Sequence, residues 1–274
     1  MATSWPGEMN LLDRTGGGYE EDILLPFAVD ELLCKAVGEG RRPVIHLWRH
    51  PSALVLGLRD RRLPNAAAAM ADLRKSGMQV AVRNSGGAAV PLDPGVVNVS
   101  VILPNPLRTL AFHPDFQYMV ELVRGGLRQY GERMDTGEIK GAYCPGDYDL
   151  SIGGRKFCGI AQRRQTKAFI VQGFIVAEGS GKRRAELVRD FYRSADGERA
   201  GEDTDSGAAG AHPIVEAAYT ASLEELGVPG GAAGFSAGVV QWLGTVTRVS
   251  QAGDGLAAEA VWGMVEQLRN RYDK

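Results

Sequence analysis

The sequence predicts an α+β fold (mixed α/β) built on a largely antiparallel mixed β-sheet flanked by helices. Short apolar or alternating runs, which are typical of strands, follow one another with brief connections. Segments with apolar residues at helical spacing lie between and after them, and some have proline near the start or glycine after the end. Strand pairs this close in sequence favour antiparallel pairing, and the helices are expected to cover the sheet.

The expected elements can be placed in order along the chain. Residues 1–22 are rich in glycine and polar residues, and we expect a mobile or loosely docked arm. The expected helices cover residues 27–37, 64–75, 115–130, 182–193, 213–226 and 256–272. The expected strands cover residues 44–48 and 53–58 as neighbours, then 79–83, 96–103 and 168–176, with a β-hairpin before the last. The stretch 236–251 fits either a helix or a strand.

These elements define the expected domain organisation. Residues 23–195 are expected to form one core domain after the N-terminal arm. Residues 196–211 have the acidic, glycine-containing composition of a flexible loop. Residues 212–274 are expected to form a C-terminal helical part that packs on the same domain.

The composition argues against several classes of function. Hydrophobic residues at 44% and charged residues at 23% are ordinary for a soluble globular protein. A net charge of −2 gives no reason to expect nucleic acid as a partner. No apolar run reaches the roughly 18 residues of a membrane-spanning helix, and the N-terminus does not resemble a secretion signal. Three cysteines favour reduced thiols and a cytoplasmic setting.

The stretch 141–172 contains a candidate nucleophile and a candidate cation. Cys144 lies beside a Pro-Gly turn, and Lys156 follows a Gly-Gly turn, on opposite arms of the predicted hairpin. A nearby ammonium favours the thiolate, which can carry an acyl group as a thioester. The alternative is a structural turn cysteine with solvated hairpin charges. Cys34 and Cys158 are expected to be buried hydrophobes.

A glycine-containing segment, R-N-S-G-G-A-A-V-P-L-D at 83–93, follows a predicted strand. The adjacent Gly86 and Gly87 allow a close backbone approach and positive φ angles. Exposed N–H groups there could hold an acyl carbonyl or a phosphate. The segment matches neither the Walker A loop nor the dinucleotide-binding fingerprint, and a structural turn is the alternative.

Taken together, these motifs resemble the lipoate-protein ligase and octanoyltransferase superfamily. R-N-S-G-G-A-A-V-P-L-D-P-G-V-V-N-V-S (83–100) is similar to its first signature, and D-L-S-I-G-G-R-K-F-C-G-I-A-Q-R-R (149–164) to its lysine-bearing hairpin. W-R-H-P-S-A-L-V-L-G-L-R-D (48–60) also fits. The resemblance implies the fold of the biotin and lipoate-protein ligase catalytic domain. The expected substrate-binding residues are Arg83, Ser85, Gly86, Gly87, Asp93, Gly159, Ile160 and Ala161.

Within the superfamily, the residues favour one branch. ATP-using ligases typically carry a third glycine and a His-Asp pair in the first motif, where this chain has Ala88 and Leu92-Asp93. The Cys-Pro-Gly ahead of the hairpin is similar to the LipL and LipM octanoyltransferases, and the form Y-C-P-G-D-Y-D-L-S-I-G-G-R-K-F favours LipL. That resemblance implies that Cys144 carries the acyl group and that Lys156 lowers the pKa of Cys144. It implies no metal, no ATP and no other cofactor.

The LipL resemblance also implies the partner proteins. The octanoyl donor would be the lysine of the glycine-cleavage H protein, and the acceptors would be lipoyl domains of 2-oxoacid dehydrogenases. Three alternatives stay open: a transferase that takes octanoyl from acyl carrier protein, an ATP-dependent lipoate-protein ligase, and a non-catalytic module that binds lipoyl carriers.

Overall fold

The computed structural model describes residues 3–107, 113–197 and 212–272. The large sheet consists of β1 (Glu8–Arg14), β2 (Val44–Trp48), β6 (Val96–Pro104), β7 (Asp135–Thr136), β8 (Leu150–Ile152), β9 (Arg155–Arg164), β10 (Ala168–Val176) and β11 (Arg248–Gln251). A smaller sheet consists of β3 (Ala53–Leu56), β4 (Gln79–Val82) and β5 (Val90–Leu92). The helices are α1 (Leu25–Gly38), α2 (Ala66–Lys75), α3 (Phe116–Gly126), α4 (Gly181–Asp196), α5 (Gly231–Val246) and α6 (Ala258–Tyr272).

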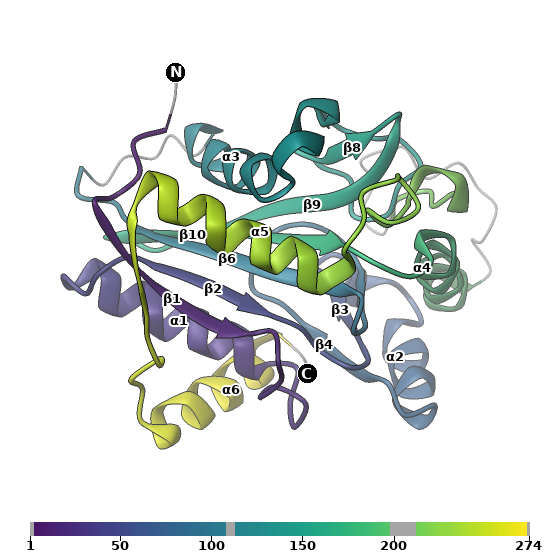
Figure 1. Ribbon diagram of the computed structural model, residues 1–274. Coiled ribbons are helices and arrows are strands. Elements are labelled where there is room, and N and C mark those ends of the chain that lie inside the picture. Colours follow the sequence, from purple (N-terminus) through teal and green to yellow (C-terminus); the bar gives the residue numbers. More distant parts are fainter. Residues whose placement is uncertain (1–2, 108–112, 198–211, 273–274) are drawn as a thin grey trace.

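The strands of the large sheet lie in the order β11-β1-β2-β6-β10-β9-β8-β7 (Figure 1). Every neighbouring pair from β2 to β7 is antiparallel, whereas β1 runs parallel to both β2 and β11. In the smaller sheet, β3 runs parallel to β4 and antiparallel to β5. The predicted α+β fold with a largely antiparallel mixed sheet is therefore confirmed.

Helices cover both faces of the large sheet. Helices α1 and α6 pack together on one face, and α3 and α5 pack together on the other (Figure 1). Strand β6 contributes to both layers, because successive side chains of a strand point to opposite faces. Val97, Val99 and Val101 lie in the core under α3 and α5, whereas Val96 and Ile102 lie in the core under α1. Helices α2 and α4 pack beside the smaller sheet.

Most of the predicted helices and strands are present, but three predictions are wrong. Residues 8–14 form β1 inside the large sheet rather than a loose arm, and Met9 and Leu11 are fully buried. Strands β2 and β3 belong to different sheets and are not neighbours. Residues 213–226 form no α-helix. Two of their backbone N–H groups bond instead to strands of the large sheet: Ala221 N donates to Lys156 O and Leu223 N to Val176 O.

The ambiguous stretch 236–251 contains both structures, the end of α5 and the strand β11. The predicted helix over 115–130 ends as α3 at Gly126, where α5 packs so closely that a Cβ on Gly125 would lie 2.3 Å from the ring of Trp242. Most of the predicted acidic loop, residues 198–211, lies outside the described residues. Within the described residues, no helix is both long and apolar enough to cross a membrane.

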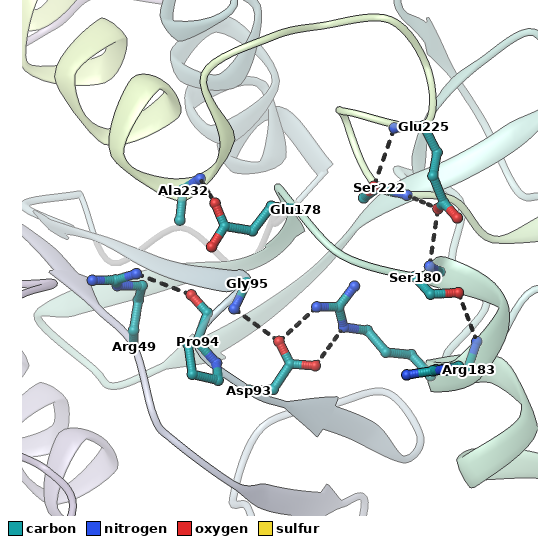
Figure 2. A network of polar contacts seen from close by, with 12 residues as sticks. Arg49, Asp93, Pro94, Gly95, Glu178, Ser180, Arg183, Ser222, Glu225 and Ala232 are labelled. Carbon is teal, nitrogen blue, oxygen red and sulfur yellow. Dashed lines mark hydrogen bonds and ion pairs between the residues drawn. The ribbon is translucent and has the colours of Figure 1, made fainter.

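Two glutamates connect the C-terminal part to the core by hydrogen bonds (Figure 2). Glu225 accepts hydrogen bonds from Gly181 N, the first residue of α4, at 2.9 Å and from Ser222 N at 2.8 Å. Glu178 accepts one from Ala232 N in the first turn of α5 at 2.9 Å. Each carboxylate therefore satisfies backbone donors at a helix N-terminus, where negative charge is favoured.

Candidate active site

A pocket lies where the two sheets meet. Strands β2, β6, β9 and β10 of the large sheet contribute to it from one side, and β3 and β5 of the smaller sheet from the other. Most of its lining is apolar: Phe27, Trp48, Val55, Val90, Leu92, Val99, Ile160 and Phe174. A pocket with this apolar lining is suited to an apolar group such as an acyl chain.

Cys144 lines this pocket from a turn, residues 143–149, that we call the cysteine turn. Its φ angle of 50° is left-handed, which is uncommon for a residue with a side chain and is often found at functional sites. The residue is 8% exposed. Its Sγ atom lies 3.2 Å from Ala88 N and 3.6 Å from Nη2 of Arg83. The thiol is therefore held at the pocket wall by polar donors.

The other two cysteines lie away from the pocket. Cys34 and Cys158 are both fully buried. Burial raises the pKa of each thiol well above its ordinary value, which keeps both in the unreactive protonated form. Neither lines the pocket.

Lys156 lies behind the cysteine turn in a buried ion pair. Its ammonium is 2.8 Å from Oδ2 of Asp149, and both side chains are 1% exposed. Lys156 also donates to the backbone carbonyls of Tyr143, at 2.9 Å, and Cys144. Burial raises the pKa of Asp149 to about 6, and the neighbouring Lys156 charge opposes this rise.

The segment 83–88, which we call the glycine loop, passes over the cysteine turn. Gly87 has a φ angle of 95°, and a Cβ placed there would lie 2.8 Å from Cys144 Sγ. Gly86, by contrast, has open space where its Cβ would be. Arg83 donates from Nε to Gly86 O at 3.1 Å and from Nη2 to Ala88 O at 2.7 Å. The glycine loop can therefore approach Cys144 closely because residue 87 has no side chain.

Several polar atoms in the pocket have no protein partner. Ser85 Oγ, Asn98 Nδ2 and Gln172 Oε1 are buried without a hydrogen bond to any described residue. Buried polar groups normally find partners, so these atoms are available to a bound ligand. On its other side, the Gln172 amide donates to Asp30 at 2.9 Å, and Asp30 also bonds to His46 at 2.8 Å.

The structure brings together most of the residues predicted for the site. Arg83, Ser85, Cys144, Gly159, Ile160 and Ala161 line the same pocket. Gly86 and Gly87 lie in the glycine loop, and Lys156 lies behind the cysteine turn. Gly159 leaves room for its neighbours, since a Cβ there would lie 2.5 Å from the Phe174 ring. Asp93 lies outside the pocket, where its carboxylate pairs with Arg184 (Figure 2).

Sequence reasoning missed Asp149 and the aromatic lining. Asp149 lies two residues before Ser151, which is paired with Lys156 across the hairpin. An acidic residue on the arm opposite a lysine was a usable signal for this pair. Phe27 on α1 and Trp48 on β2 gave no such signal, because their approach to Phe174 on β10 depends on how distant elements pack.

Comparison with known proteins places these features in a family. A model of the lipoyl protein ligase A/B catalytic domain matches residues 22–211. The chain belongs to this family. The octanoyl-[GcvH]:protein N-octanoyltransferase of Geobacillus kaustophilus is 44% identical over 79% of this chain and 74% of that relative. The same-named protein of Bacillus velezensis is 40% identical over 82% of this chain and 76% of that relative. The resemblance to the superfamily is confirmed.

Two other similar proteins differ from these relatives, one in the acyl group that its name gives and one in sharing only the fold with this chain. The lipoyl-[GcvH]:protein N-lipoyltransferase of Listeria monocytogenes is 42% identical over 66% of each chain. The structure of lipoate-protein ligase A bound with ATP superposes with a TM-score of 0.68 over 98% of this chain and 97% of that chain. Their sequence identity is 17%, so this second likeness concerns the fold alone.

Proposed function

We propose that this protein is an octanoyltransferase that forms a thioester on Cys144. It takes the octanoyl group from a lysine of the glycine-cleavage H protein, the donor named in its relatives, and passes it to a lysine on lipoyl domains of 2-oxoacid dehydrogenases. The single observation that carries the chemistry is the position of Cys144. Among the described residues, it is the cysteine whose thiol borders the apolar pocket at the junction of the sheets.

The proposed reaction has two balanced halves. In the first, the Cys144 sulfur forms a bond to the acyl carbon and the C–N bond of the donor amide breaks. The proton given up by the thiol ends on the departing amine. The Lys156 ammonium lies behind the cysteine turn and favours the thiolate through its charge. In the second, the acceptor amine attacks the thioester, the C–S bond breaks and a proton returns to sulfur.

The pocket supplies what this chemistry requires. Its aromatic and aliphatic walls bury the alkyl chain, which stabilises binding by about 0.8 kcal/mol for each methylene removed from water. The glycine loop and the segment Gly159–Ala161 border the chain near the reacting carbon. The unpartnered donors of Ser85 and Asn98 provide hydrogen bonds for the acyl carbonyl.

Mass spectrometry of the acyl-enzyme tests this proposal. Wild type incubated with octanoylated H protein is expected to gain one octanoyl group on the Cys144 peptide, and this group should disappear when a lipoyl domain is added. The variant Cys144→Ser should transfer nothing, whereas Cys158→Ser serves as the matched control and should retain the adduct. Absence of an adduct in wild type, or full transfer by Cys144→Ala, would overturn the mechanism.

The same assay identifies the donor. Octanoyl-acyl carrier protein, lipoylated H protein, and free lipoate with ATP are compared with octanoylated H protein at equal concentration. We expect octanoylated H protein to give the fastest Cys144 acylation. Faster acylation from acyl carrier protein would assign the protein to the alternative transferase. An acyl-adenylate formed from ATP would assign it to the ligases.

A further inference from the structure

Among the described residues, two polar groups bond to the sulfur of Cys144, and both belong to the glycine loop. Ala88 N lies 3.2 Å from Sγ, and Nη2 of Arg83 lies 3.6 Å from it. These distances are within the range of a hydrogen bond to sulfur. A donor directed at sulfur stabilises the charged thiolate more than the neutral thiol. The groups that contact the nucleophile are therefore a backbone N–H and a guanidinium.

The ammonium of Lys156 is occupied by other acceptors. It bonds to the carbonyl oxygens of Tyr143 and Cys144, and it pairs with Asp149. Because an ammonium has three N–H donors, none is left for Cys144 Sγ in this arrangement. Its positive charge is also largely balanced by the Asp149 carboxylate. Lys156 therefore holds the cysteine turn and acts on sulfur only from a distance.

The guanidinium of Arg83, by contrast, is buried without a carboxylate partner among the described residues. Arg83 is 6% exposed. Its other acceptors are the backbone carbonyls of Val55, Gly86 and Ala88. Asp60, the nearby acid, accepts instead from Gly57 N and from the Tyr192 hydroxyl. Asp60 offsets part of the Arg83 charge without pairing with it directly. A buried charge without a direct ionic partner is costly, so a thiolate beside Arg83 is stabilised as a counter-ion.

We propose that Arg83 is a catalytic residue whose guanidinium, together with the Ala88 N–H, holds the sulfur of Cys144 as a thiolate. Arginine suits this role because it stays protonated at all relevant pH values and its fork is fixed by backbone carbonyls. The assignment rests on the proposed thioester function of Cys144. It applies to both half-reactions, since the thiolate is the nucleophile in the first and the leaving group in the second.

The pH dependence of Cys144 alkylation by iodoacetamide tests the proposal. The rate is followed on the Cys144 peptide by mass spectrometry in wild type, Arg83→Gln, Arg83→Lys and Lys156→Gln. An opposite charge within about 4–6 Å changes a titration midpoint by about one to three pH units. We expect the midpoint of the alkylation profile to rise by this amount in Arg83→Gln. The rise should be smaller in Arg83→Lys and in Lys156→Gln than in Arg83→Gln.

A matched control is Arg49→Gln. Arg49 likewise donates to backbone carbonyls, those of Thr15 and Pro94, but it does not line the pocket. Its loss should leave the alkylation profile unchanged. Circular dichroism establishes that each variant is folded. If Arg83→Gln does not fold, Arg83→Lys decides, because the proposal requires its midpoint to lie above that of wild type and an unchanged midpoint overturns it.

The surrounding titratable groups must not produce the same shift. Tyr143 and Tyr192 interact with Cys144 itself. Asp60 interacts with Arg83, and Asp149 interacts with Lys156. Burial raises the pKa of both tyrosines, so they stay neutral across the range measured. An unchanged midpoint in the Arg83 variants, or a larger shift in Lys156→Gln, overturns the role of Arg83. Octanoyl adduct formation by wild type is measured separately, so a failure of the proposed function is distinguished from a failure of the Arg83 role.

Discussion

Asp149 contributes to the site by fixing both Lys156 and the cysteine turn. Its Oδ2 accepts from Gly146 N at 3.2 Å, and its backbone N–H donates to Gly146 O at 3.0 Å. The same carboxylate pairs with Lys156, which bonds to the Cys144 carbonyl. Cys144 therefore keeps its left-handed conformation because the residues on either side of it are tied down. Burying this ion pair has a desolvation cost, which we infer is tolerated for its positioning role.

The substitution Asp149→Asn is expected to separate positioning from stability. Burial raises the pKa of Asp149 from 3.8 to about 6, so the folded protein binds a proton there more readily than the unfolded chain. The stability of wild type relative to the variant should therefore fall as pH rises from about 4 to about 6. Urea denaturation of both proteins across this range measures it. A relative stability that rises with pH would contradict the assignment.

The same Asp149→Asn protein should lose activity because Lys156 no longer has an anionic partner to hold it in place. Lys156 holds the cysteine turn, and a small displacement of the Cys144 nucleophile lowers rates strongly, so we expect acyl transfer to fall about tenfold or more. Single-turnover acylation of Cys144 near neutral pH gives this value.

At the scale of elements, the glycine loop depends on close backbone approach at two positions. A Cβ on Gly57, just after β3, would lie 2.0 Å from the carbonyl oxygen of Gly87. Gly87 itself has a positive φ and lies against Arg83 and Cys144. The smaller sheet therefore carries the loop to the cysteine turn, and glycine is required because any side chain would separate them.

Adjacent alanine substitutions in the glycine loop test this arrangement. Gly87→Ala forces a side chain into a left-handed position between Arg83 Nη2 and Cys144 Sγ, and we expect acylation to fall about 10²-fold. Gly86→Ala meets no atom within 4 Å and should change the rate only slightly. Equal effects of the two substitutions on single-turnover acylation would show that the contact with sulfur is unimportant.

At the scale of the whole molecule, the C-terminal part contacts the core on both faces of the large sheet. Helix α6 packs on α1, which carries Phe27 into the pocket, and α5 packs on α3 across the other face. Ala221 and Leu223 bond to the start of β9 and the end of β10, and Glu225 and Glu178 accept hydrogen bonds from the first turns of α4 and α5 (Figure 2). We infer that this C-terminal part supports the strands that line the pocket.

Neighbouring glutamates provide a test of this connection. Glu225→Ala removes the acceptor for Gly181 N and Ser222 N, and should lower the free energy of unfolding by about 0.5–2 kcal/mol. Glu224→Ala is the control, because its exposed carboxylate has no hydrogen bond or ion pair with a described residue. Chemical denaturation compares the two variants with wild type. A larger loss in Glu224→Ala would refute the capping role of Glu225.

The sequence by itself determined the family, the fold class and most of the local elements. It also placed Cys144, Lys156 and the glycine loop at the site, since each motif is a short, contiguous pattern. Helix α1 and strands β6 and β10 were predictable because periodicity, caps and turn residues are local properties. The same locality explains why Asp93 was included: it follows the glycine loop in sequence but lies outside the pocket in space.

Only the tertiary structure decided which residues share a pocket and which charges are paired. β1 has partners 34 or more positions away along the chain, from Asn10 with Val44 to Glu8 with Arg248, so no local pattern could show that it belongs to the sheet. The contact of Arg83 with Cys144 likewise depends on how two loops fold against one another. The physical reason is that a side chain interacts with the groups that lie near it in space, and these are often far from it in the sequence.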